Sequence, residues 1–226
     1  MSQYLANPRR GHLDQIYHIF GYLRQVGKRS IYLDPEYPAI TKERFVEFDW
    51  TDFYADAKEP ISPNAPEPRG KPLEIHLFVD SDHGGDRMTR RSQTGILIFC
   101  NRAPITWISK RQNSVQNSTF GAEFCALKQA VENVEALRFK LRSFGVPVED
   151  ASSVYCDNEA VFKNVSMPIS VLSKKHHSVA YHFCRQAVAM GMIKIAKEDS
   201  ETNLADLFTK ILPRASRERL LDLFTY

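Results

Sequence analysis

Ile75-His76-Leu77-Phe78-Val79-Asp80-Ser81-Asp82 is the stretch of this 226-residue chain that decides its fold. The run from Ile75 to Val79 is apolar except for one histidine, which is typical of a central strand buried on both faces. Asp80 follows at once, so the pattern predicts a carboxylate at the carboxyl end of a central strand. Open α/β sheets bind their ligands in the crevice at that edge.

A second predicted strand ends in the same way. Ser152 to Cys156 is a short apolar run, and Asp157 comes directly after it. An acid after a single strand is more often a turn residue or a helix cap than a site residue. Two central strands that both end in aspartate are less easily explained as two caps, so we expect Asp80 and Asp157 to share a site.

Two further acids lie beside apolar helical stripes. Glu123 precedes Phe124 near the start of a long predicted helix, and Asp206 precedes Leu207 in the last one. Each could instead be a first-turn acid that the helix dipole favours. Four carboxylates packed together would raise one another's pKa values, and divalent cations would relieve that repulsion. Shared carboxylates are also what a two-metal phosphodiesterase site requires, and Mg²⁺ prefers them.

The rest of the chain supplies the sheet and its helices. The stretches 94–100 and 104–109 form a predicted hairpin, and 192–196 is a fifth strand. Apolar residues at three- and four-residue steps predict helices over 120–144, from about Asn158, over 176–190 and over 204–211, the last stopped by Pro213. The expected fold class is therefore α/β, a mixed five-stranded sheet flanked by helices.

The N-terminal third has a different character. Residues 9–26 read as an amphipathic helix and 30–33 as a short extended run, which together cannot form a core. Residues 34–72 hold most of the chain's 12 prolines and read as a linker or a surface-wrapping loop. We expect this helical appendage to pack on the later domain or on a partner.

Composition sets broad limits on the class of protein. Hydrophobic residues at 43% and charged residues at 25% describe an ordinary globular chain, and a net charge of +3 says little about partners. No apolar stretch is long enough to span a membrane and no signal peptide is evident, so we expect an intracellular protein. The four cysteines form no close pair, which favours reduced buried thiols over a zinc site.

Several motifs resemble a known family. Phe78–Asp86, Arg91–Gly95, Pro104–Gln112 and Ala122–Leu127 resemble, in order, the ribonuclease H domain of copia-type retrotransposon Pol polyproteins. The likeness continues through Cys156–Asn158, Lys175-His176, Tyr181-His182 and Leu204–Lys210, and covers roughly residues 74–212. One departure is that the loop 197–202 lacks the histidine that cellular ribonucleases H carry before their last acid.

The resemblance implies a ribonuclease H-like fold that hydrolyses the RNA strand of RNA–DNA hybrids during reverse transcription. Asp80, Glu123, Asp157 and Asp206 match the family's metal-binding, catalytic carboxylates, which implies two Mg²⁺ ions, with Mn²⁺ as a substitute. The first 33 residues resemble the end of a reverse transcriptase, which implies an upstream reverse transcriptase domain as a partner. It also implies a location in the cytoplasm or in a virus-like particle.

The resulting domain division has four parts. Residues 1–40 are the expected C-terminal remnant of reverse transcriptase, a helix plus a short strand, and 41–72 are a Pro-rich acidic linker. Residues 73–212 are the ribonuclease H-like domain, and 213–226 are a C-terminal helical tail.

Other polar residues have weaker claims on the site. We expect Arg87, Arg90, Arg91, Lys110 and Arg111 to contact nucleic-acid phosphates, against the alternative of a solvated charged loop. Asp82 is a candidate outer ligand, whereas Asp86 is expected to brace its loop or to pair with Arg87, Arg90 or Arg91. His176, His177 and His182 favour packing or backbone contact with a hybrid, since no acid or cysteine completes a metal set.

Two alternative functions remain open. The domain could be a catalytically silent scaffold or nucleic-acid-binding module of a truncated polyprotein, although all four carboxylates are present. It could also be another nuclease of the same superfamily, such as an integrase-type strand transferase.

Overall fold

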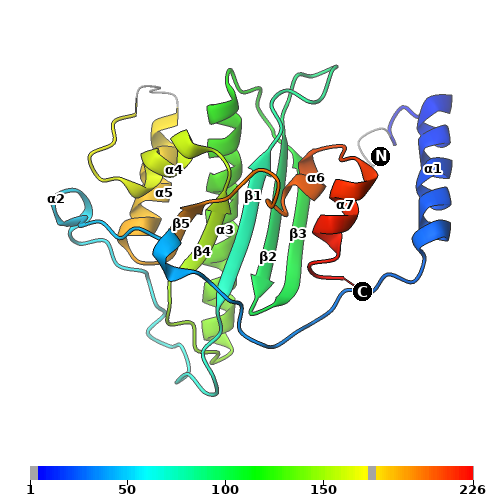
Figure 1. Ribbon diagram of the computed structural model, residues 1–226. Helices are drawn as coiled ribbons and strands as arrows, with labels where there is room; N and C mark the ends of the chain where they lie inside the picture. The colour runs from blue at the N-terminus through cyan, green and yellow to red at the C-terminus, as the bar shows by residue number, and fades with distance from the viewer. Residues whose placement is uncertain (1–4, 173–176, 226) are drawn as a thin grey trace.

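The computed structural model describes residues 5–172 and 177–225. Its centre is a five-stranded sheet in the order β3-β2-β1-β4-β5 (Figure 1). The strands are β1 (Ile75–Ser81), β2 (Gln93–Cys100), β3 (Ala103–Arg111), β4 (Ser152–Cys156) and β5 (Ile193–Lys197). The predicted fold class, a mixed five-stranded sheet flanked by helices, is confirmed.

The central strand pairs differently on its two sides. β1 runs antiparallel to β2, which continues antiparallel to β3, whereas β1 and β4, and then β4 and β5, pair in parallel. In the parallel pair Val79 lies opposite Cys156. All residues of β1 except Phe78 are buried, as expected of a strand covered on both faces.

Three helices cover one face of the sheet. α3 (Thr119–Ser143) begins at Ser118, whose side chain accepts a hydrogen bond from the Gly121 backbone. α4 (Glu159–Ser166) begins at Asn158, which caps it in the same manner, and α5 (Ser178–Ala189) packs against α3 and α4. The largest hydrophobic cluster lies between these helices and the sheet, and includes Leu77, Phe124 and Val154.

The opposite face carries two short helices, α6 (Asp206–Thr209) and α7 (Arg214–Leu221). Leu204 and Leu220 pack there on Leu97 and Phe99 of β2. The prediction of one helix over 204–211 is wrong in extent, because Lys210 already has an extended backbone and the chain restarts as α7 after Pro213.

The N-terminal helix stands apart from the sheet, at the right-hand edge of Figure 1. α1 (Arg10–Val26) contains no buried residue, and Tyr17, Phe20 and Leu23 of its apolar stripe are exposed. The predicted strand at 30–33 is reduced to one bridge between Ile31 and Thr225. Within the described part of the chain, no helix is both long and apolar enough to cross a membrane.

Residues 34–72, which we call the strap, lie along the surface of the sheet domain and include η2 (Lys42–Arg44) and α2 (Thr51–Tyr54). Side chains anchor it at intervals. Asp34 pairs with Arg102, and buried Trp50 lies under the guanidinium of Arg185. The strap therefore follows the domain surface closely, through contacts between residues far apart in the sequence.

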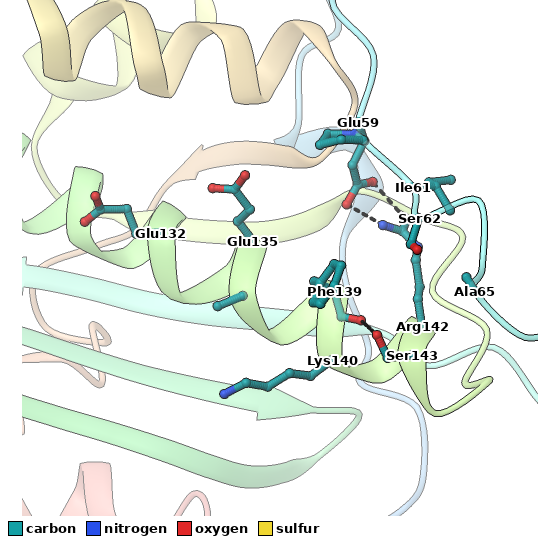
Figure 2. A pocket seen from close by; sticks show the side chains of 12 residues that line it. Glu59, Ile61, Ser62, Ala65, Glu132, Glu135, Phe139, Lys140, Arg142 and Ser143 are labelled. Carbon is teal, nitrogen blue, oxygen red and sulfur yellow. Dashed lines mark hydrogen bonds and ion pairs between the residues drawn. The ribbon is translucent and has the colours of Figure 1, made fainter.

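Glu59 forms the most heavily paired of these anchors. Its carboxylate accepts hydrogen bonds from both Arg138 and Arg142 of α3, and the side chain of Arg138 is only 1% exposed. Figure 2 shows Glu59 reaching from the strap toward Arg142 beside the outer face of α3. Burial alone would raise the pKa of Glu59, but the two arginines outweigh it and lower the pKa to about 2.

We predict that Glu59→Gln lowers the free energy of unfolding by about 3 kcal/mol, because it leaves the buried Arg138 charge without its counter-ion. The wild-type contribution is complete above pH 4.5, the ordinary pKa of this carboxyl, and is lost as the pH falls toward 2. Urea unfolding between pH 3 and pH 7 measures both effects.

Glu67→Gln, at an exposed position of the same strap, is the matched control and should change neither quantity. Equal stability of Glu59→Gln and wild type at pH 7 would contradict the role given to this anchor.

Candidate functional site

Strand register brings the first two candidate acids together. Val79 and Cys156 are paired across the parallel strands β1 and β4, so Asp80 and Asp157, the next residue on each, emerge side by side. Asp80 is 1% exposed and Asp157 is largely covered. Both lie at the carboxyl edge of the sheet, where the sequence predicts them.

The third acid reaches this edge from the opposite face. α6 packs over β2 at Gly95, the residue that pairs with Asp80. A Cβ at Gly95 would lie 2.7 Å from the Ala205 carbonyl oxygen and 2.7 Å from a Thr209 methyl carbon. Only glycine permits this close approach, which sets Asp206 beside Asp80.

Asp80, Asp157 and Asp206 each offer a carboxylate oxygen, and these oxygens all lie within 4.8 Å of one another. Glu123, in the second turn of α3, is also buried and faces the charges of Asp80 and Asp157. The structure thus brings all four predicted acids into one region, with the three aspartates as its compact part.

Burial and mutual repulsion disfavour the charged forms of these groups. Burial, and then the charges of Asp80 and Asp157, raise the pKa of Glu123 to about 9. Burial likewise raises the pKa of Asp206 to about 6, against a hydrogen bond from Lys210. The pKa of Asp157 is also raised, by burial and by the charge of Asp80. A donor set of this kind, oxygen-only and short of positive charge, fits a hard divalent cation.

Lys210 supplies the positive charge that pairs with the three aspartates in the described part of the chain. Its ammonium lies 2.7 Å from Asp206, 3.3 Å from Asp80 and 3.9 Å from Asp157, measured to carboxylate oxygens. The Thr209 hydroxyl donates to the other oxygen of Asp80. Lys210 is a site residue that the sequence patterns did not single out, although its four-residue spacing from Asp206 is the signal of such a pair on a helix.

A loop between β5 and α6 closes the far side of the site. Ser200 donates a hydrogen bond to Asp157 at 3.3 Å, and the buried amide of Asn203 donates to the Val79 carbonyl. The strap holds this loop. Arg44 contacts Glu198 at 2.6 Å and the Lys197 carbonyl, and Glu198 in turn accepts from the Thr202 hydroxyl. Contact with Arg44 could not be foreseen, because more than 150 residues separate the partners.

The loop after β1 carries the candidate phosphate contacts. Arg87 and Arg90 are exposed, Arg91 is partly exposed, and Lys110 is exposed on β3. Arg111 forms an ion pair with Asp86 at 2.6 Å, so its guanidinium is engaged within the chain. Among the described residues, no ion pair engages the side chains of Arg87, Arg90 or Lys110, and all three are exposed to solvent.

Asp86 and Asp82, which lie close together after β1, both accept hydrogen bonds from backbone N–H groups. Of the two expected roles, Asp86 has the first, because it braces its loop by accepting from the Met88 and Thr89 backbone N–H groups. The alternative, a pair with Arg87, Arg90 or Arg91, is not the one that forms. The ion-pair partner of Asp86 is Arg111, the last residue of β3. Asp82 accepts from the Gln93 backbone and is not one of the three clustered aspartates.

Among the described residues, no histidine belongs to the group formed by the three clustered aspartates. His182 bonds to the Tyr54 hydroxyl of the strap at 2.7 Å, and His177 packs edge-on against Phe120. His176 is outside the described residues. All four cysteines are free thiols, with Cys156 and Cys184 fully buried, as the sequence indicates.

No family model matches the chain. The chain is 28% identical over 148 residues to the retrovirus-related Pol polyprotein from transposon RE1 of Arabidopsis thaliana. The aligned residues make up 66% of this chain and 10% of that relative. The chain is 31% identical over 137 residues to the corresponding polyprotein from transposon TNT 1-94 of Nicotiana tabacum, covering 61% and 10%. The expected likeness to transposon Pol polyproteins is confirmed, and the chain spans about a tenth of their length.

Solved structures with a similar course of the chain are ribonuclease H domains. One is LC11-RNase H1 in complex with an RNA/DNA hybrid, at 16% identity and a TM-score of 0.47, covering 60% of this chain and 94% of the other. Another is RNase H1 from Halobacterium salinarum, at 15% identity and a TM-score of 0.43, covering 60% and 94%.

We predict that Arg44→Met loosens the loop 198–203, because Glu198 loses its only ion-pair partner among the described residues. The free energy of unfolding should fall by about 1–3 kcal/mol, the range for losing a hydrogen bond to a charged group. Hydrogen exchange should accelerate at the amides of Glu198, Thr202 and Asn203, which are hydrogen-bonded in wild type.

Arg214→Met removes a highly exposed ion pair with Glu218 and serves as the control. Unchanged exchange in the loop of Arg44→Met would refute the link between the strap and the site.

Proposed function

We propose that this chain is a metal-dependent endonuclease that hydrolyses the RNA strand of RNA–DNA hybrids during retrotransposon reverse transcription. The observation that carries the proposal is the convergence of Asp80, Asp157 and Asp206, with buried Glu123 beside them. The relatives named as transposon Pol polyproteins support the biological setting.

In this proposal the four acids are the metal ligands and hold two Mg²⁺ ions, for which Mn²⁺ can substitute. Bound ions of this kind activate a water and stabilise the leaving oxygen of a phosphodiester. The carboxylates do no covalent work. They orient the site, and their burial keeps bulk water from competing for it.

Neighbouring residues have supporting roles in the proposed site. The Thr209 hydroxyl donates a hydrogen bond to one oxygen of Asp80, and the Ser200 hydroxyl donates to one oxygen of Asp157. These bonds orient the two carboxylates. The backbone N–H of Ser81 does the same for Glu123. These three acids are thereby oriented by neutral donors that leave lone pairs free for a metal ion.

Arg87, Arg90, Arg91 and Lys110 are proposed phosphate contacts, with Arg111 acting chiefly as the brace of Asp86. Backbone contacts of this kind carry no base preference, so the substrate would be selected by hybrid shape and by the RNA 2′-hydroxyl. We further propose that residues 73–212 are the nuclease domain, and that residues 1–40 belong with an upstream reverse transcriptase domain in an intracellular particle.

A silent scaffold is the second candidate function. A scaffold has no use for four clustered carboxylates, three of them buried, because burying uncompensated charge costs stability. A strand transferase of the same superfamily would act on duplex DNA, so substrate choice separates it from a hybrid ribonuclease.

We predict that the protein cleaves labelled RNA in an RNA–DNA hybrid with Mg²⁺ and leaves duplex DNA and duplex RNA intact. Asp157→Asn should lower the rate by about a thousandfold or more, since a neutral amide is a poor ligand for Mg²⁺. Chelation with EDTA should abolish cleavage, and added Mn²⁺ should restore it.

Asp150→Asn alters an exposed acid just before the opposite end of β4 and should cleave like wild type. Cleavage of duplex DNA would favour the strand transferase. A folded wild-type protein that cleaves no substrate would favour the scaffold.

A further inference from the structure

Lys210 occupies an unusual position for a lysine. It is the residue that ends α6, and its ammonium lies among three carboxylates that come from β1, from the end of β4 and from α6 itself. Burial alone would lower its pKa, but the hydrogen bond to Asp206 and the three aspartate charges raise it. Lys210 is therefore a firmly charged cation inside the candidate metal site.

The charge balance of the site depends on this one residue. Among the described residues, every ion pair of Asp80, Asp157 and Asp206 is with Lys210. One ammonium cannot neutralise three aspartates, yet it lies against a carboxylate oxygen of each, and these are the carboxylates that a metal ion would use. A cation of charge +2 placed at those oxygens would lie within a few ångströms of the ammonium and be repelled by it.

The side chain of Lys210 is more exposed than the carboxylates that it contacts. It is 37% exposed, whereas the carboxylates it contacts are 1%, 8% and 13% exposed. The backbone at Lys210 is already extended, and the next residue, Ile211, is fully exposed. A rotation of the long side chain would move the ammonium to solvent without disturbing Asp206, which the short helix and Asn203 hold in place.

We propose that Lys210 is an internal counter-ion that holds the carboxylates together in the metal-free protein and that divalent cations must displace. This inference rests on the proposed function, because it assumes that the cluster is the metal site. Lys210 therefore weakens metal binding while it stabilises the metal-free chain. Displacement turns the ammonium toward the solvent side of the site, where the scissile phosphate of a substrate would approach.

The reciprocal effects on metal affinity and metal-free stability make the proposal testable without a cleavage assay. The full chain, freed of ions with EDTA and dialysed, is titrated with MgCl₂ and with MnCl₂ by calorimetry, and its melting temperature is measured before any ion is added. Lys210→Met removes the charge but keeps the length of the side chain. Lys210→Arg keeps the charge, and Lys140→Met removes an exposed charge at the far end of α3.

Lys210→Met should bind Mg²⁺ about tenfold more tightly than wild type or better, since a unit charge a few ångströms away is removed. The melting temperature of metal-free Lys210→Met should be lower than that of metal-free wild type by roughly 2–4 °C or more. Saturating Mg²⁺ should raise it to the melting temperature of wild type in the same concentration of Mg²⁺. Lys210→Arg and Lys140→Met should bind Mg²⁺ with a Kd within about threefold of the wild-type value. A difference of that size is clearly smaller than the tenfold change expected for Lys210→Met.

Measurable binding to wild type with equal or weaker binding to Lys210→Met would overturn the inference and leave the proposed function standing. Binding to Lys210→Met alone would support the inference in its strongest form. If neither protein bound either ion at millimolar concentration, the metal site itself, and with it the proposed function, would fail.

Discussion

Repulsion among buried carboxylates is the constraint on which the rest of this structure depends. Asp80 and Asp157 are forced together by backbone pairing, because parallel register fixes the ends of β1 and β4 at one level. Nothing local to either residue can separate them. The hydrophobic cluster beneath them, which includes Leu77 and Val154 on these same strands, supplies the burial free energy that outweighs the repulsion.

The chain compensates for this repulsion from three directions. α6 brings Lys210 to the aspartates, and it can do so because Gly95 leaves room for it on β2. The loop before α6 brings Ser200 to Asp157. The strap then holds that loop through Arg44 and Glu198. A segment that looks like a linker in the sequence is thus connected, by charged groups, to the geometry of the candidate site.

The sequence was a good guide to the sheet and to the two strand-borne acids. Alternation, apolar runs and turn residues are local signals, and β4 was predicted with its observed ends. Asp206 was harder to assess, since α6 has only four residues and its position depends on packing against Gly95. The partners of Asp86 and Glu59 could not be predicted, because a charge pairs with whichever opposite charge the fold brings near it.

The molecule contains both matched and unmatched acidic charges. Glu59 sits between two arginines, so its negative charge is fully matched and it acts as a structural anchor. The three clustered aspartates of the site share one ammonium and remain short of positive charge. A buried cluster that the fold leaves under-neutralised lowers stability, and a chain with no use for it would gain by replacing any one of the acids with a neutral residue. The imbalance is what a site that accepts a divalent cation would show, and Asp80, Asp157 and Asp206 are compatible with one.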